Sequence, residues 1–475
     1  MSAMTDIPQA VSRATGLAPA DAELVRELLD VWRRKRPRNL LRSRYYEMHQ
    51  RPRELGISVP PHLRSLEQVV GWPAKAVDAL VARSQFDGYV SDDAGTESEL
   101  RRIVASNGLR RAYRKAATSE CKHSCAFATV TAGADGPEVR FHPATSSAAL
   151  WDFGRNRIRV GLVVVDYERG RGRSHLPTWV DVFTDSAVIV IMRGRAGWHA
   201  EYLPHSMGRC LMEPLAYAAT LERPFGKSRI TRAVMNITDD AMRESVRSEI
   251  SAEFFTSPQK YLLGADKEAL GDQTKWDAYI GNIFSVSRDE DNNVPTFGQL
   301  AQGSMRPHVD YMRQLAARFS GETNVPVSSL GVVSDNPSSA EAIYAAKEDM
   351  VIDAQNLNAD NGEALRNVAY MALAVTRGTD YATEVARAEV RAKFANPATP
   401  SAVSRADALL KIVQASQVDS YITLSDVFLE EAGFDDDQIQ RLQSARARSQ
   451  SQAILAQARQ AAGLPPGPAG GGDPA

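Results

Sequence analysis

Cysteine is scarce in this chain of 475 residues, which contains only Cys121, Cys125 and Cys210. An odd number of cysteines without a dense spacing pattern gives no disulfide framework, and this favours a reducing compartment such as the cytosol. The N-terminus lacks a basic stretch followed by an apolar one, and no run of about 18 apolar residues occurs. We therefore expect neither export nor insertion into a membrane.

An excess of charge of either sign is also missing. The 56 basic and 58 acidic residues leave a formal net charge of −2. A protein that binds nucleic acid tightly is usually clearly basic, so any contact with DNA is expected to be local or loose. The length predicts more than one packed unit, and a hydrophobic content of 43% is ordinary for a folded chain.

Motifs that carry catalysis are absent. The segment 226–228, Gly-Lys-Ser, resembles the end of a phosphate-binding loop, but Leu221 stands where that motif needs its first glycine. The C-x-H-x-C run from Cys121 to Cys125 has no second ligand cluster, so we interpret it as ordinary helix residues. Neither H-E-x-x-H nor G-x-S-x-G occurs. We expect no catalytic, cofactor-binding or metal site.

A basic segment lies inside a helical pattern that runs from Ala20 to Met48. Its members are Arg33, Arg34, Lys35, Arg36, Arg38, Arg42 and Arg44. Such a segment either contacts phosphates or forms a solvated helix end that meets an acidic neighbouring subunit. Both interpretations fit the sequence, and the first five residues are our candidates for a contact patch.

The next part of the chain changes from helix to strand. A second helical stretch covers Ser65–Ser84, and short runs rich in Val and Ile follow between Ala126 and Tyr202. Gly, Pro or Asp separate these runs, which is typical of an antiparallel meander. The predicted strands are Arg157–Asp166, Thr178–Thr184, Ala187–Arg193 and Gly197–Tyr202.

Two helices then enclose a small block of strands. In the first, Thr231–Phe255, apolar residues repeat every four positions at Met242, Val246, Ile250 and Phe254. The second, Met305–Phe319, places Val309, Met312, Ala316 and Phe319 on one face. The strands predicted between the two helices are Gln259–Gly264, Tyr279–Val286 and Val294–Phe297.

The remainder is predicted to be mainly helical. A polar loop, Ser320–Pro337, leads to a long helix that opens with the capping pair Ser338 and Glu341 and ends near Thr376. Asn361 and Gly362 are positions where this helix could bend. Three helices follow at Ser401–Ala415, Thr423–Ala432 and Asp435–Ala462, and the Pro- and Gly-rich tail Gly463–Ala475 is expected to be disordered.

This order of elements resembles the portal proteins of tailed bacteriophages, particularly phages that infect actinobacteria. The resemblance covers nearly the whole chain, and the order of its segments is more specific than any one motif. The segments that carry it are Pro224–Ile230, Ser257–Gly264, Gly298–Leu300, Thr323–Pro326 with Leu330–Gly331, Asn336–Ile343, and Asn396–Lys411.

The resemblance implies an α+β portal-type fold. Its expected parts are the N-terminal wing at 1–230, a first stem helix at 231–256, the clip at 257–304, a second stem helix at 305–322, a tunnel loop at 323–337, a long wing helix at 338–378, the crown at 379–462 and a disordered tail at 463–475. The implied function is a ring-shaped channel at one capsid vertex, for DNA packaging and ejection.

The resemblance also implies partners and a location. A closed ring of 12 copies is expected, with heterologous contacts between copies. The expected partners are double-stranded viral DNA without sequence preference, the major capsid protein, the terminase large subunit, a head-completion or adaptor protein, and scaffold. The protein is expected in the virion after synthesis in the host cytoplasm, with no enzymatic activity and no cofactor.

Two sets of residues are candidates for the channel. In the stem these are Asp240, Glu244, Arg247 and Glu249. The acids between Asp239 and Glu253 outnumber the arginines there, so we predict net negative charge toward the lumen, which suits a conduit that must not grip phosphates. In the tunnel loop, which carries no basic residue, the candidates are Thr323, Asn324, Val325, Pro326, Ser328 and Ser329.

Two other classes of protein remain as alternatives. A head-to-tail adaptor or minor capsid protein is one, although adaptors are usually much shorter and the paired helices with their insert would be unexplained. A DNA-packaging enzyme such as the terminase is the other. It is disfavoured because the phosphate loop and a clustered acidic metal site are missing.

Overall fold

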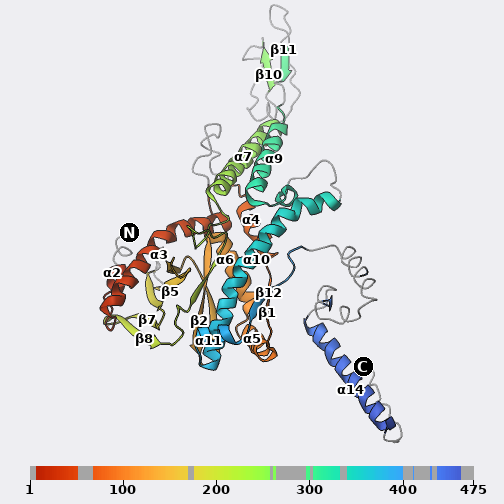
Figure 1. Ribbon diagram of the computed structural model, residues 1–475. Helices are drawn as coiled ribbons and strands as arrows, with labels where there is room; N and C mark the ends of the chain where they lie inside the picture. Colours follow the sequence, from red (N-terminus) through yellow and green to blue (C-terminus); the bar gives the residue numbers. More distant parts are fainter. Residues whose placement is uncertain are drawn as a thin grey trace, which may run out of the picture. The chain divides into compact units, whose positions relative to one another are not determined.

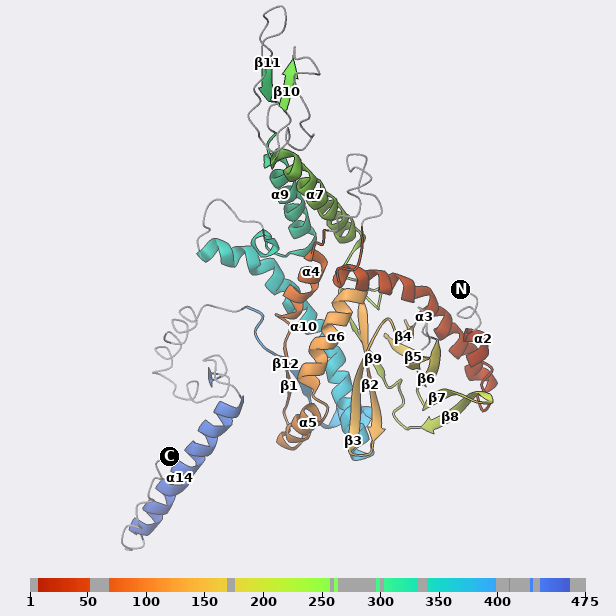
Figure 2. The same cartoon turned by 180° about the vertical axis from the view of Figure 1, so that it is seen from behind.

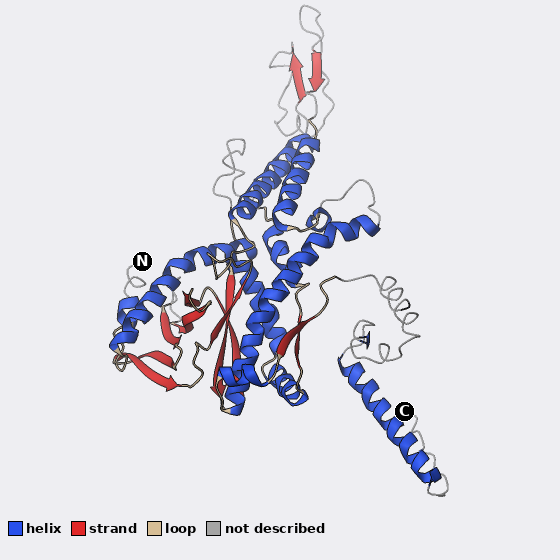
Figure 3. Cartoon of the chain, viewed as in Figure 1, coloured by secondary structure: helices blue, strands red, loops and turns tan. Residues whose placement is uncertain are grey.

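The computed structural model describes residues 7–51, 68–168, 176–256, 260–263, 296–299, 303–331, 340–398, 410, 428–429 and 436–461. The chain divides into two compact units, Met1–Pro397 and Ala398–Ala475. Helices and strands are mixed throughout the first unit (Figure 1, Figure 3), and every pair of named strands is antiparallel. The fold is therefore α+β, as predicted.

Three helices open the first unit: α2 (Ile7–Val11), α3 (Pro19–Tyr46) and α4 (Trp72–Val81). α3 begins with a proline in its first turn, where the missing N–H has no intrahelical partner to lose. Its apolar residues Val25, Leu28 and Leu29 are fully buried. They pack with the inner face of a five-stranded sheet, and Trp32 Nε1 donates to the Thr145 carbonyl at 2.9 Å.

That sheet is a meander in which each strand pairs with the next along the chain. Its strands are β4 (Ser147–Asp152), β5 (Arg157–Tyr167), β6 (Pro177–Phe183), β7 (Ala187–Gly194) and β8 (Gly197–Pro204). The four predicted strands correspond to β5 to β8. Alternate residues of β5, namely Val160, Leu162 and Val164, face the α3 side, as the period of two requires.

The chain between Phe86 and Ala216 contains further elements that the sequence did not predict separately. They are β1 (Phe86–Ser91), α5 (Ala94–Ser106), α6 (Leu109–His123), β2 (Cys125–Gly133), β3 (Gly136–Pro143) and β9 (Met212–Ala216). β2 is the middle strand of a three-stranded sheet, between β3 and β9. Cys121 and His123 lie in α6 as expected, but Cys125 is the first residue of β2.

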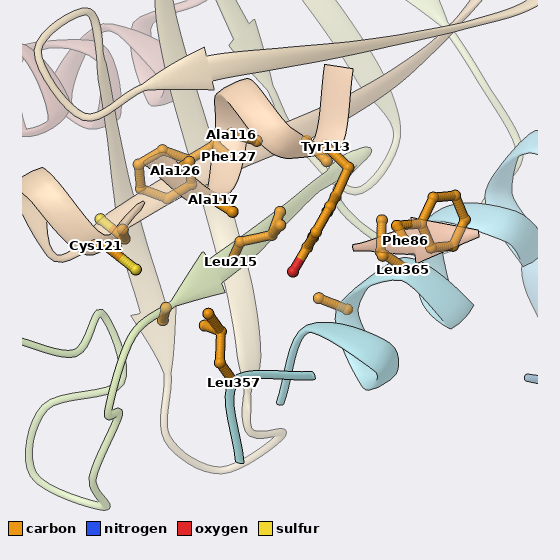
Figure 4. Close-up of a cluster of buried hydrophobic side chains, with 14 of the residues drawn as sticks. Phe86, Tyr113, Ala116, Ala117, Cys121, Ala126, Phe127, Leu215, Leu357 and Leu365 are labelled. Carbon is orange, nitrogen blue, oxygen red and sulfur yellow. The ribbon is translucent and has the colours of Figure 1, made fainter. Parts of the chain in front are cut away.

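The main core forms where α6 and this sheet meet the long helix α10 (Ala340–Arg377). Figure 4 shows Leu357 and Leu365 of α10 close to Tyr113 of α6 and Leu215 of β9. The Tyr113 ring also contacts Phe86 and Phe394, with ring centroids 5.9 and 5.6 Å apart. Burial of each large apolar side chain contributes about 1.5–3 kcal/mol, so this cluster is the main source of stability in the first unit.

Two antiparallel helices extend from this core (Figure 1, Figure 2): α7 (Arg232–Thr256) and α9 (Arg306–Thr323). The strands β10 (Lys260–Leu263) and β11 (Thr296–Gln299) pair between them in the sequence. These elements match the predicted helices and two of the three predicted strands, while Tyr279–Val286 lies outside the described residues. α9 ends four residues later than predicted.

The predicted apolar stripes of the two helices differ in outcome. Met242, Val246 and Ile250 of α7 are buried, and the Phe254 side chain lies outside the described residues. On α9, Ala316 and Phe319 are fully buried and Met312 is half-buried. Val309 is 48% exposed, so it is the member of this face that remains open. It lies at the margin of that face, toward solvent.

The connection after α9 is more ordered at its start than a polar loop suggests. Asn324 ends the helix with a φ of 54°, a left-handed conformation that Asn tolerates better than most residues. A short 3-10 helix, η3 (Val327–Leu330), follows. α10 then continues as one helix past Asn361 and Gly362. The predicted cap Ser338 lies outside the described residues.

Two short elements complete the first unit. After α10 come α11 (Tyr381–Arg387) and β12 (Val390–Phe394), and β12 pairs with β1. The chain from 381 to 394 is thus part of the first unit, which ends near Pro397. In the second unit, α14 (Asp436–Ala461) matches the last predicted helix. The helices at Ser401–Ala415 and Thr423–Ala432 and the tail lie outside the described residues.

Candidate functional site: the helix pair and its base

A polar bridge joins the two helices of the α7/α9 pair. His308 of α9 lies between two side chains of α7, with Nδ1 2.6 Å from Glu244 Oε1 and Nε2 3.0 Å from Ser251 Oγ. In the neutral ring, Nδ1–H donates to the carboxylate and Nε2 accepts from the serine hydroxyl. Glu244 is only 5% exposed. This predicted channel-lining residue therefore points into the helix pair and holds it together.

The helix pair has two unlike sides. On one side a hollow of about 440 Å³ opens between the helices. Its lining includes Glu249, Ser245 and Ser248 of α7 and His308, Val309, Met312 and Arg313 of α9. Residues two positions apart on a helix point about 200° away from each other, since the repeat is 3.6 residues. Tyr311 therefore points away from Val309 and Arg313, and Arg247 points away from Ser245 and Glu249.

The other predicted lining residues are charged groups with partners inside the chain. Asp240 forms an ion pair with Arg243, one turn further along α7. Arg247 Nη1 lies 3.8 Å from Glu244 Oε2. Glu249 is exposed and lies at the hollow. Of the four stem candidates, Glu249 is the one that offers an exposed carboxylate to the surroundings.

A buried arginine holds the base of the helix pair. Arg229 lies just before α7 and is 4% exposed. Its guanidinium donates to the Ala76 carbonyl of α4 at 2.6 Å, to the Tyr217 hydroxyl at 2.7 Å, to Asp353 of α10 at 3.1 Å and to the Thr323 carbonyl at the end of α9. A buried guanidinium needs such acceptors because it remains charged in proteins. We call Arg229 and these acceptors the base joint.

The base joint continues into the connection after α9. Asn324 Nδ2 donates to the same Asp353 carboxylate at 3.1 Å. The backbone N–H of Arg229 donates to the Cys121 carbonyl at the end of α6, and the neighbouring Ser228 hydroxyl donates to the Lys122 carbonyl. The joint therefore ties the start of α7, the end of α9 and the long helix α10 to one another.

The structure separates the six tunnel-loop candidates into two groups. Thr323, Val325 and Pro326 are buried, and Asn324 is held half-buried at the base joint. They are therefore packed residues and not surface contacts of the connection. Ser328 and Ser329 of η3 are exposed. The remaining predicted loop residues, 332–337, lie outside the described residues.

The predicted basic patch is only partly available to a partner. Arg33 forms an ion pair with Asp30 at 2.9 Å, and the Arg36 guanidinium lies 5.5 Å from the centre of the Trp32 ring. Arg34, Lys35 and Arg38 are exposed. Their spacing places them on one side of α3. The last two members of the basic segment differ, since Arg44 is exposed and Arg42 donates to the His123 carbonyl at 2.6 Å.

Among the described residues, the thiols and histidines do not assemble into a metal site. All three cysteines are buried and free, and burial raises the pKa of the Cys125 thiol to about 12. Burial and two nearby cations, Lys122 and Arg42, lower the pKa of His123 to about 3. Within the described parts of the chain, no three His, Cys, Asp or Glu side chains gather as metal ligands. No described helix is long and apolar enough to cross a membrane.

Sequence reasoning missed both the base joint and the His308 bridge. Arg229 lies in the segment Pro224–Ile230 that carries the family resemblance, so the sequence did mark its position without giving it a role. His308 offered no signal, because its partners Glu244 and Ser251 are more than fifty positions away.

Comparisons with known proteins agree with the resemblance seen in the sequence. No family model matches the chain. The portal protein of Mycobacterium phage L5 is 27% identical over 385 residues, which cover 78% of this chain and 77% of that protein. The portal protein of Mycobacterium phage D29 is 27% identical over 384 residues, with the same coverage.

Two solved structures give a weaker likeness. The neck of an empty gene transfer agent particle, computed with C6 symmetry, has a TM-score of 0.44 at 13% identity and covers 83% of this chain and 90% of its own. The neck of a native gene transfer agent particle, computed with C12 symmetry, has a TM-score of 0.41 at 13% identity. It covers 72% of this chain and 85% of its own. Scores this low do not establish a shared fold.

The two sequence relatives each cover 78% of this chain. Both are portal proteins of phages that infect mycobacteria, so the likeness agrees with the resemblance that the order of elements in the sequence indicates.

Proposed function

We propose that this chain is a phage portal protein and forms a closed ring of about twelve copies at one vertex of the capsid, through which viral DNA enters and leaves. The likeness to two named portal proteins over 78% of the chain is the observation that carries the proposal. Its place of action is then the virion, after synthesis in the host cytoplasm. We expect it to act as a structural conduit without enzymatic activity.

The two-sided helix pair supports a ring. A closed ring needs heterologous contacts, in which one patch meets a different patch of the next copy. One side of the pair has the hollow with the apolar side chains Val309 and Met312 and the acid Glu249. Tyr311, which is 38% exposed, points away from Val309, and Arg247 points away from Glu249. A protruding aromatic ring with a nearby cation complements an apolar hollow with a nearby acid.

The charges of the pair suit a channel that DNA must slide through. Each phosphate neutralised by the protein adds affinity that would have to be broken at the next step. Asp240 and Glu244 are already paired with cations of the same chain, so the pair presents little uncompensated positive charge. Glu249 is the described stem residue that we propose for the lumen or for the contact between copies.

The contacts with other proteins follow from the resemblance. We propose that the far end of the helix pair, where β10 and β11 lie, docks the terminase large subunit and later a head-completion or adaptor protein. The major capsid protein and scaffold are proposed to contact the body of the first unit. The exposed residues Arg34, Lys35 and Arg38 of α3 offer one basic surface for an acidic neighbour or for DNA phosphates.

Cysteine cross-linking tests the ring and the contact together. Ser248→Cys places a thiol at the hollow, and Tyr311→Cys places one at an exposed position of α9 that points away from Val309. A disulfide requires Cα atoms less than about 7 Å apart, and one formed within a single chain would leave a monomer and add nothing to a ladder of oligomers. The three native cysteines are buried and do not interfere. Oxidation of the double variant should give a ladder of covalent oligomers that ends at the ring size.

The controls distinguish failure of the ring from failure of the proposed contact between copies. Each single-cysteine variant, and a double variant with Phe153→Cys in place of Tyr311→Cys, should give no ladder; Phe153 is 69% exposed in the turn after β4. Electron microscopy and mass photometry of the unmodified protein come first. A monomer under all assembly conditions would overturn the ring, whereas rings without a ladder would overturn only the contact through the two sides of α7 and α9.

A further inference from the structure

A second buried polar site lies in the core, away from the helix pair. Glu120 of α6 and Asn361 of α10 are both completely buried. Asn361 Nδ2 donates to Glu120 Oε2 at 2.8 Å and to the Tyr113 hydroxyl at 3.0 Å, and Tyr113 in turn lies 2.7 Å from Ser84 Oγ. The two hydrogen atoms of the Asn361 amide are therefore both used.

One oxygen atom on each of the two side chains has no hydrogen bond. Glu120 Oε1 and Asn361 Oδ1 are buried and have no hydrogen-bond partner. Both are acceptors when the carboxyl is ionised, and a buried acceptor without a donor costs about 1–3 kcal/mol. The two side chains are already joined through their other atoms. A single proton on the carboxyl would give both remaining atoms a partner.

A negative charge on Glu120 would have no neighbouring cation among the described residues. In the part of the chain that the structure describes, no cation lies within ion-pair distance of it. The titratable groups that interact with it are Tyr113 and Cys121 of α6, Cys125 of β2 and Asp360 of α10, all neutral or acidic. Glu213 of β9 is buried to a similar degree but lies 2.5 Å from Arg209.

We propose that Glu120 is a neutral carboxylic acid whose hydroxyl donates to Asn361 Oδ1, so that an acid–amide pair with two hydrogen bonds fastens the long helix α10 to α6. No charge is then buried, and both orphan atoms are satisfied. The pair lies midway along α10, between the end that leads to the connection after α9 and the end that leads to α11. Protonation of Glu120 therefore contributes to the packing of α10 against the core.

The pair makes the attachment of α10 sensitive to alkaline pH. Burial, and next the negative charge of Asp360, raise the pKa of Glu120 to about 8 from its ordinary value of 4.5, although the hydrogen bond from Asn361 acts in the opposite direction. The folded chain then holds a proton that the unfolded chain has released between these two values. Stability is fully present below the unfolded pKa, declines as the pH rises, and is lost above the folded pKa.

The isosteric substitution Glu120→Gln tests the pair. Its amide can donate to Asn361 Oδ1 and accept from Asn361 Nδ2, but it cannot ionise. The wild type should lose several degrees of melting temperature between about pH 6 and pH 9, and E120Q should lose markedly less. The infrared difference between wild type and E120Q at about pH 6 should show the carbonyl stretch of a protonated carboxyl.

Glu213→Gln is the matched control, because it neutralises a buried acid that has a cation. It should destabilise the protein at both pH values and leave the alkaline loss of the wild type in place. The proposal is overturned if the infrared difference shows a carboxylate at about pH 6, or if E120Q loses as much stability as the wild type. Should E120Q fail to fold, an unchanged melting temperature of the wild type across this pH range would overturn it equally.

Discussion

The base joint and the centre of the core bury ionisable groups in opposite ways. At the base joint the charged Arg229 is surrounded by acceptors, including the carboxylate of Asp353. In the core Glu120 has an amide donor but no cation. A buried charge is tolerated only when partners replace its hydration, and a group without them loses its charge instead. The base joint is therefore stabilised by a charged group with acceptors around it, and the core pair by a carboxyl that keeps its proton.

The largest expected effect is at the joint. Arg229→Met removes the cation but keeps an unbranched side chain of similar length, so Asp353 loses its cation and the Thr323 and Ala76 carbonyls lose this donor. We expect a loss of about 3–5 kcal/mol in the free energy of unfolding, measured with denaturant.

Asp353→Asn is the companion variant. Its carboxylate is 24% exposed, so water can replace part of what is lost, and the effect should be clearly smaller than that of Arg229→Met. Equal losses in the two variants would contradict the view that the arginine is the centre of the joint.

An intermediate effect is expected at the bridge between α7 and α9. His308→Ala removes both hydrogen bonds of the half-buried imidazole and leaves Glu244 and Ser251 without this partner. We expect a loss of about 1–3 kcal/mol. The neighbouring Val309→Ala, at an exposed position, should cost much less. If the two variants lose the same amount in denaturant unfolding, the bridge does not stabilise the pair.

The smallest effect is expected at the surface of the same helix. Arg243 and Asp240 form an ion pair one turn apart, and both side chains are partly exposed to water, which screens the attraction. Arg243→Ala should therefore change the free energy of unfolding by less than about 1 kcal/mol, in either direction. A loss as large as that of Arg229→Met would show that this pair, too, acts as a buried charge.

The predictions from sequence succeeded where a local pattern decides the structure. The meander β5 to β8 follows from short β-rich runs between turn residues, and α7 and α9 follow from apolar residues at helical spacing. Thr231 shows the same locality: its hydroxyl accepts from the Val234 N–H at 3.2 Å and caps α7. Such signals lie within a few neighbouring residues, so one sequence is enough to detect them.

The sequence was less informative where burial is decided by distant segments. Val309 follows the periodicity of the apolar stripe of α9, yet it lies open at the hollow, because no described element covers that position. Thr323 to Pro326 look like polar loop residues, yet they pack at the base joint. The chain from 381 to 394 belongs to the first unit because β12 pairs with β1, about 300 residues earlier.

The sequence by itself determined the order of the helices and strands, the resemblance to portal proteins, and the lack of any recognisable catalytic or metal motif, because composition, periodicity and ordered motifs carry that information. Only the tertiary structure decided that Glu244 meets His308, that Arg229 is shared by α4, α9 and α10, and that Glu120 meets an amide instead of a cation. The energy of a buried polar group depends on which groups replace its water, and folding brings those groups from distant parts of the chain.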